Sequence, residues 1–190
     1  MHIIKIKKLF LLLLFTNVIT AQVSSIVRNK DSYTQEVFPY KGVRAIQIDE
    51  VNSPGNEDNV FIFSKIEKNE NPDKMYFQRF TKVNDKWIVK SIIEVNHNGI
   101  ISAWGSRKAF WDFDKDKSID ALFIYGLYDA DFKQQSVHLI FSQKDQLYTI
   151  ESSVSDNFGT NKFSSNFDSL SEIYKAKILE YWNKLDKKDK

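Results

Sequence analysis

The sequence predicts an α+β fold that is mostly β, an antiparallel meander of about eight or nine strands with a C-terminal amphipathic helix packed on it. Short apolar runs rich in Ile, Val, Phe, Tyr and Trp recur between clusters of Asn, Gly, Pro and Asp. Several connections are too short for the crossovers that parallel strands need. At the end of the chain the apolar period changes from that of a strand to that of a helix.

The first 21 residues have the three parts of a secretory signal peptide. Lysines precede an almost wholly apolar run over residues 9–19, and Ile19 and Ala21 occupy the positions that a signal peptidase inspects. A spanning helix needs about 20 apolar residues, so a retained membrane anchor is the weaker alternative. We expect residues 1–21 to be removed and residues 22–190 to form a single exported domain, periplasmic or on the cell surface.

Charge and composition exclude several classes of protein. The chain has 27 Lys and Arg against 25 Asp and Glu, but removal of the three signal-peptide lysines leaves 24 against 25, a net charge of −1. The exported domain therefore has no basic field to attract nucleic acid, and it contains no run that could span a membrane. The absence of Cys excludes disulfides, thiol catalysis and Cys-bound zinc.

The predicted strands follow a segment at residues 22–39 to which the sequence assigns no element. Each apolar run is four to ten residues long and has the β-branched and aromatic side chains that pleated strands prefer. Tight hairpins are predicted at residues 84–85 and 144–145, because two-residue connections join antiparallel neighbours. The runs are residues 43–48, 60–63, 75–80, 87–95, 100–104, 108–111, 119–128, 137–141 and 147–150.

An amphipathic helix is predicted over residues 169–187, after a polar loop. Ser169 and Glu172 have the spacing of a capping box, in which each side chain bonds the backbone of the other residue. In the simplest interpretation the apolar stripe packs on the sheet, and binding of a membrane or partner is the alternative. The stripe consists of Leu170, Ile173, Tyr174, Ile178, Tyr181, Trp182 and Leu185.

The one segment with metal-binding chemistry is residues 112–120, Asp-Phe-Asp-Lys-Asp-Lys-Ser-Ile-Asp. Alternate acidic residues let a tight loop turn several oxygens toward one point, and calcium takes six to eight oxygen ligands at about 2.3–2.6 Å. We expect a structural calcium site here. Its ligands would be the side chains of Asp112, Asp114, Asp116 and Asp120, the last directly or through water, and the backbone carbonyl of Ser118.

Two positions depart from the usual pattern of such loops. Lys117 stands where Gly normally allows the turn, and a side chain in left-handed geometry costs about 1–2 kcal/mol. Phe123 stands where a glutamate would close the site, although Asp129 or Asp131 could substitute if the fold brings either near. A solvated acidic turn without an ion and a catalytic carboxylate pair are the alternatives.

Three consecutive features carry a family resemblance: an aromatic strand at residues 101–104, the acidic loop, and an apolar strand at residues 122–126 that ends in Tyr-Gly. This order resembles the core of a family of small exported Bacteroidetes proteins known as surface polysaccharide biosynthesis proteins. The loop also resembles the Asp-rich loops of FG-GAP repeats, which likewise have Gly where Lys117 stands. The resemblance implies association with envelope polysaccharide or an envelope protein, and it brings no catalytic residues.

Aromatic and histidine side chains are weaker candidates. Trp104 stands at a strand end and is the best candidate to stack on a sugar ring, although such residues usually pack in a core. His97 lies in a turn, and His138 alternates with apolar residues on a strand, so we expect His138 to point outward and no zinc site. No nucleophile elbow, phosphate loop or selected carboxylate pair indicates an enzyme.

We therefore expect an exported, non-enzymatic protein that associates with surface polysaccharide and has a structural calcium site at residues 112–120. A carbohydrate-acting enzyme that uses a carboxylate pair is one alternative. A module that binds a protein partner through an exposed sheet edge is the other.

Overall fold

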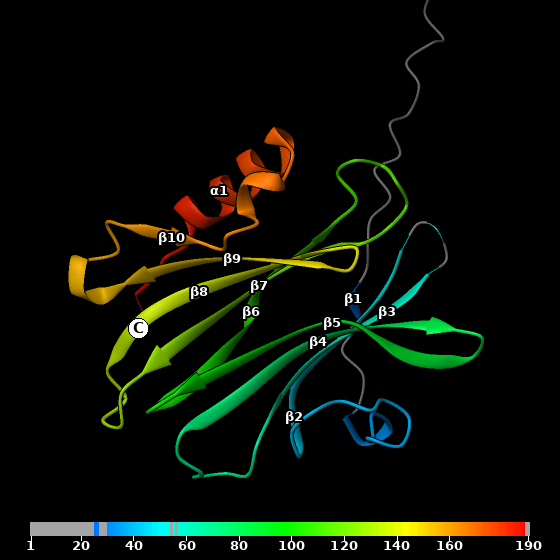
Figure 1. Cartoon of the computed structure of the whole chain (residues 1–190), viewed down its shortest axis with the longest axis horizontal. Coiled ribbons are helices and arrows are strands. Elements are labelled where there is room, and N and C mark those ends of the chain that lie inside the picture. The colour runs from blue at the N-terminus through cyan, green and yellow to red at the C-terminus, as the bar shows by residue number, and fades with distance from the viewer. Residues whose placement is uncertain (1–24, 27–29, 54, 56, 189–190) are drawn as a thin grey trace, which may run out of the picture.

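The computed structural model describes residues 25–26, 30–53, 55 and 57–188. These residues form two five-stranded antiparallel sheets and a C-terminal helix, which confirms the predicted mostly β fold (Figure 1). The signal peptide predicted at residues 1–21 lies outside the described part of the chain. Within that described part, no helix combines the length and the apolar character needed to cross a membrane.

The first sheet is a meander whose strands lie side by side in chain order. Asn84 and Asp85 both have positive φ, 49° and 60°, and form the predicted two-residue turn between the last two strands. Asn tolerates this conformation better than most residues, which is why the turn could be predicted. The strands are β1 (Ser25–Ile26), β2 (Arg44–Asn52), β3 (Asp58–Lys65), β4 (Asp73–Val83) and β5 (Lys86–His97).

The second sheet is also a meander in chain order. The two runs predicted as separate strands at residues 100–104 and 108–111 form a single strand, β6, with a bulge in it. Ala103 pairs with Tyr125 and Lys108 pairs with Phe123, so four residues of β6 lie opposite one residue of its neighbour. The strands are β6 (Ile100–Trp111), β7 (Asp120–Tyr128), β8 (Gln134–Gln143), β9 (Gln146–Ser153) and β10 (Asn161–Phe163).

Aromatic side chains form the core between the two sheets. Phe61, Phe63 and Phe77 come from the first sheet and Phe123 from the second, and neighbouring rings have centroids 5.0–6.1 Å apart. Each such contact contributes roughly 0.5–1.5 kcal/mol beyond the burial of its surface. This cluster stabilises the sandwich of a chain that has no cysteine.

The outer faces of both sheets are covered as well. Tyr33 and Phe38, from the segment to which the sequence assigned no element, pack on Ile62 and Phe80 of the first sheet. Helix α1 (Glu172–Lys184) lies across the outer face of the second sheet (Figure 1). Strands that are buried on both faces have continuous apolar runs in the sequence rather than alternating apolar and polar residues. The remaining short helical turns are η1 (Lys30–Ser32), η2 (Val154–Asp156) and η3 (Phe167–Ser169).

The start of α1 differs from the prediction. Ser171 is its N-cap residue, and Ser169 instead ends η3, where its hydroxyl donates to the carbonyl of Asn166 (2.7 Å). The predicted capping box between Ser169 and Glu172 is therefore wrong. The chain makes an extra turn there because Phe167 must reach the core.

The predicted apolar stripe of the helix packs on the second sheet, with one exception. Tyr174, Ile178 and Trp182 recur every four residues and are buried against the second sheet. Ile173 is 67% exposed, although it belongs to the predicted stripe. Leu170 is also buried in this cluster, and Tyr181 and Leu185 pack against it, so Ile173 is the one member of the predicted stripe that faces solvent.

Candidate metal site

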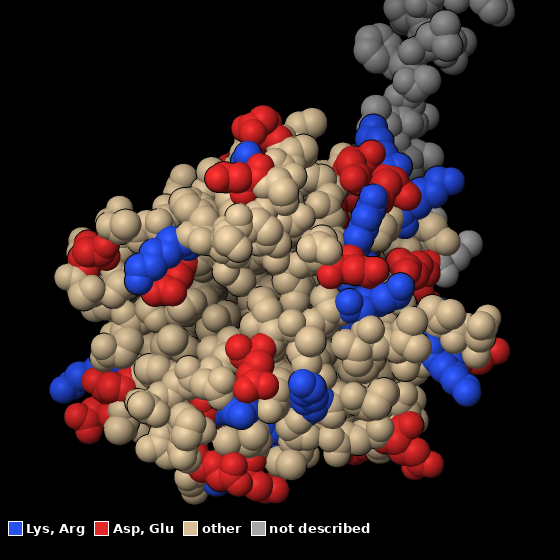
Figure 2. Space-filling view, viewed as in Figure 1, with Lys and Arg blue, Asp and Glu red and all other residues tan. Residues whose placement is uncertain are grey.

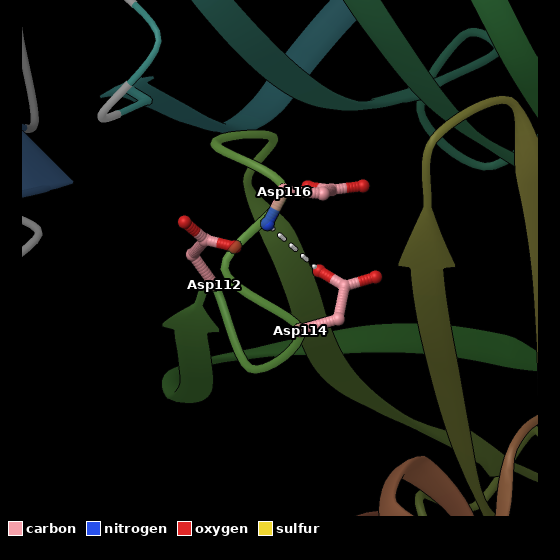
Figure 3. A group of neighbouring side chains, drawn as sticks. All are labelled: Asp112, Asp114 and Asp116. Carbon is pink, nitrogen blue, oxygen red and sulfur yellow. Dashed lines mark hydrogen bonds between the residues drawn. The ribbon is translucent and has the colours of Figure 1, made fainter.

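The acidic loop joins β6 to β7, and its first three aspartates lie together. Asp112, Asp114 and Asp116 each have a carboxylate oxygen within 4.8 Å of the other two. Figure 3 shows the three side chains arranged around one turn of the loop. The cluster could hold a metal ion, as the alternate spacing predicted, because it supplies several oxygen ligands at one point.

The loop backbone has the tight conformation that the site requires. Lys117 has a φ of 70°, so it adopts the left-handed conformation for which Gly is usual. Its amide donates to Asp112 Oδ2 (3.2 Å), and the amide of Asp116 donates to Asp114 Oδ1 (3.3 Å), a bond that Figure 3 marks. These bonds wind the chain so that alternate carboxylates turn toward one another.

Residues from both sheets hold this loop in place. The amide of Gly55 donates to the carbonyl of Lys117 (3.1 Å), and a Cβ at residue 55 would lie only 2.9 Å from that oxygen. Arg79, which is 1% exposed, lies 3.5 Å from the hydroxyl of Ser118 and donates to the carbonyl of Lys144. The sequence could not associate Gly55, Arg79 or Lys144 with the loop, because they come from distant parts of the chain.

Among the described residues, the loop has one ion pair and one buried carboxylate oxygen without a hydrogen-bond partner. Lys144 Nζ lies 2.7 Å from the carboxylate of Asp116. Burial opposes ionisation of Asp116, but Lys144 and the amide of Ser118 outweigh it and hold the pKa of Asp116 below its ordinary value. Asp112 Oδ1 is buried and has no hydrogen-bond partner among the described residues. A buried acceptor without a donor costs free energy, and a cation would satisfy it.

Asp120, the fourth predicted carboxylate ligand, is not part of the three-aspartate cluster. Asp120 is 2% exposed and accepts a hydrogen bond from the hydroxyl of Tyr174 (2.8 Å), so it ties β7 to helix α1. Burial, with the nearby charges of Asp114 and Asp116, raises the pKa of Asp120 to about 7. Ser118 lies at the end of the loop, where its amide donates to Asp116 Oδ1 (2.8 Å).

The two acidic residues considered for closing the site lie at the other end of β7. Asp129 accepts hydrogen bonds from the amides of Asp131 and Lys133 within its own turn, both at 2.9 Å. A strand rises about 3.3 Å per residue, so the length of β7 separates this turn from the acidic loop. The remaining ligands of a bound ion would therefore be loop carbonyls and water.

No protein family, curated protein or solved structure matches this chain.

The chemistry of the three-aspartate cluster favours a hard cation. Among the described residues the cluster contains carboxylates and no histidine, and the chain has no cysteine. Figure 2 shows acidic and basic side chains interspersed over one face of the molecule, without an extended region of one sign.

The other predicted residues lie away from the loop. Trp104 is half-buried in the bulge of β6, packs against the core under α1 and donates to the hydroxyl of Tyr128 (3.1 Å). His97 Nε2 lies 2.7 Å from the carbonyl of Tyr128. The prediction that His138 points outward is wrong: the side chain is 8% exposed and stacks on Tyr125, because β8 is buried on both faces.

Proposed function

We propose that this protein is an exported, non-enzymatic envelope protein whose loop at residues 112–120 binds calcium as a structural ion. One observation carries the calcium site: three carboxylates converge, and one of their oxygens, Asp112 Oδ1, is buried without a partner among the described residues. Carboxylates brought together in this way repel one another unless a cation lies between them.

Calcium suits the cluster better than zinc does. Two oxygens bound to one calcium ion at about 2.3–2.6 Å from it can be up to about 5 Å apart, so the three carboxylates need little rearrangement. Zinc in proteins prefers nitrogen and sulfur ligands. An exposed loop with carbonyls and water nearby also suits the flexible coordination of calcium.

The role of the ion would be structural. The loop connects the bulged edge strand β6 to β7, and residues 55 and 79 tie it to the first sheet. A bound cation would hold these contacts together without a disulfide.

Thermal unfolding tests the calcium site. About 5 mM calcium should raise the Tm relative to a chelated sample, since a ligand at about 100 times its Kd stabilises by about 2.7 kcal/mol. For a chain of this size that corresponds to roughly 5–10 °C. The double variant Asp112→Asn/Asp114→Asn should lose the shift, and Asp131→Asn, on the distant turn, should keep it. An unchanged Tm, or an equal shift in the double variant, would refute the site.

The proposed partner of the exported domain is envelope polysaccharide. Its support is the resemblance of residues 101–104, 112–120 and 122–126 to the exported family described above. A pull-down from envelope extract, with and without chelation of calcium, tests the association. Recovery of polysaccharide or of an envelope protein would support it, and recovery of stray cytosolic proteins alone would count against it.

A further inference from the structure

A groove of about 420 Å³ opens between the edge strand β5 of the first sheet and strands β9 and β10 of the second. Its volume falls within the range of about 300–1,000 Å³ that is typical of small-molecule sites. The groove is separate from the acidic loop, and its lining combines aromatic, aliphatic, acidic and basic side chains.

Two nearly buried polar side chains line this groove. Tyr125 is 5% exposed and His138 is 8% exposed, and their rings stack with centroids 4.7 Å apart. His138 Nε2 is satisfied by the hydroxyl of Ser136 (2.7 Å). His138 Nδ1 lies 4.0 Å from Glu151 Oε2, beyond hydrogen-bond distance, and the hydroxyl of Tyr125 has no hydrogen bond to any described residue.

The protonation states of these two groups make them hydrogen-bonding groups rather than charges. Burial raises the pKa of Tyr125 and lowers the pKa of His138 to about 4. The phenol therefore stays protonated and the imidazole stays neutral near pH 7. Because Glu151 faces Nδ1, the tautomer with its proton on Nδ1 is favoured, and both groups offer donors to a ligand.

The rim of the groove supplies acceptors without a net charge. Glu151 forms an ion pair with Lys162 at 3.3 Å, and Glu94 forms one with Lys74 at 3.2 Å. The carboxylates can still accept hydrogen bonds through their other lone pairs. A charged ligand would have to compete with these pairs, whereas a neutral polar ligand would not.

Aliphatic side chains form the apolar part of the wall. Ile93 and Val95 supply it from β5. Phe163 on β10 pairs with Ile150 and its ring packs on Phe167, with centroids 4.7 Å apart, so the ring lies on the α1 face of the second sheet, away from Tyr125 and His138. The two β5 side chains therefore offer the apolar surface that a ligand can cover.

We propose that this groove binds a neutral saccharide. Sugar hydroxyls both donate and accept, so they match the donors of Tyr125 and His138 and the carboxylates of the rim, while the apolar face of a pyranose ring packs on Ile93 and Val95. The inference rests on the proposed polysaccharide association for its biological meaning and locates the contact in this groove rather than at Trp104.

Titration of the full chain by nuclear magnetic resonance tests the groove. The probes are neutral tetrasaccharides of glucose, mannose, galactose, xylose and N-acetylglucosamine, with tetragalacturonic acid as the charged comparison. At least one neutral probe should shift the amide signals of residues 93–96, 125, 138 and 162–164. Tyr125→Phe and Glu151→Gln should each weaken that binding at least about fivefold, which corresponds to about 1 kcal/mol. Phe132→Ala, which removes a 75% exposed ring outside the groove, should not.

Two results would overturn the inference: no shift of the groove signals by any neutral probe at about 10 mM, or unchanged affinity in both groove variants. Tyr125→Phe keeps the ring and Glu151→Gln keeps the shape of a half-exposed side chain, so far-ultraviolet circular dichroism should show both variants folded. If the groove variants still recover envelope polysaccharide in the pull-down, the proposed association survives and only its location in the groove fails.

Discussion

At the scale of single residues, Lys144 is the nearest competitor of a cation in the acidic loop. Its ammonium pairs with Asp116, and the carboxylate in turn raises the pKa of Lys144. Lys144→Met should therefore tighten calcium binding about twofold to fivefold, because exposed ion pairs are weak. Calorimetric titration with calcium would measure this change. Lys68→Met removes an equal charge near the other end of β3 and should leave the affinity unchanged; equal effects of the two variants would contradict the competition.

His138 should make the stability of the protein depend on pH. Its pKa of about 4 in the folded state lies below the ordinary 6.5, because burial disfavours the charged ring. Between these pH values the unfolded chain binds a proton that the folded chain does not. The contribution of His138 is therefore full above about pH 6.5 and falls by an amount on the order of 3 kcal/mol as the pH approaches 4.

The pH dependence caused by His138 must be measured against a variant that lacks this histidine, because the titration of Asp120 changes the stability in the opposite direction. Its pKa of about 7 means that ionisation destabilises the folded state as the pH rises from about 4. Urea unfolding of the wild type and of His138→Gln at a series of pH values isolates the histidine. A stability difference between the two proteins that stays constant from pH 4 to pH 7 would show that His138 does not titrate as expected.

At the scale of elements, helix α1 offers a matched pair of substitutions. Ile178 is fully buried against the second sheet, whereas Ile173, on the same helix, is 67% exposed. Ile178→Ala should cost about 2–5 kcal/mol, the usual loss for removing a buried aliphatic side chain. Ile173→Ala should change the stability by less than about 0.5 kcal/mol. Denaturant unfolding would measure both changes in stability. Similar losses for the two variants would mean that the helix does not dock through the face that carries Ile178.

The edges of the two sheets are all short or irregular. β1 and β10, at one edge of each sheet, have two and three residues. At the other edges, β5 has a register shift at Lys90 and β6 has its four-residue bulge. Bulges and short strands discourage the addition of another strand. The alternative of a partner bound along a sheet edge therefore has little support from the described strands.

At the scale of the whole molecule, a buried ion pair joins the two sheets at one corner. Lys65 on β3 donates to the carboxylate of Asp73 on β4 and to the carbonyl of Ile101 on β6 (3.0 Å). Asp73 also accepts from the amide of Ile101 (2.9 Å). Lys65 is 7% exposed and Asp73 is 9% exposed, so each group depends on the other in a region with little water.

Removing one member of this ion pair should lower the free energy of unfolding more than removing both members. Lys65→Met leaves a buried carboxylate without its counter-ion and should cost about 3–5 kcal/mol. Lys65→Met/Asp73→Asn removes both charges and should recover part of that loss. Unfolding in urea compares the two variants, with Lys74→Met, at an exposed pair, as a control expected to change little. A double variant less stable than the single one would contradict this account.

Local patterns in the sequence account for the elements that were predicted correctly. Residues 84–85 form their hairpin because the turn depends on their own conformational preferences, and most strands extend the predicted apolar runs by only a few residues. The bulge of β6 and the start of α1 were missed. Both depend on what the neighbouring strands and the core require rather than on the residues themselves.

For the acidic loop, the sequence alone predicted that three aspartates at alternate positions would converge, because nearby residues of a tight loop interact within the loop. The partners that complete or limit the site, Arg79, Lys144 and Tyr174, come from distant segments. The groove with Tyr125 and His138 exists only once the two sheets pack. Chain composition and periodicity thus determined the β meanders and the acidic cluster, and tertiary packing decided which polar groups were buried together, because burial depends on contacts across the sheets.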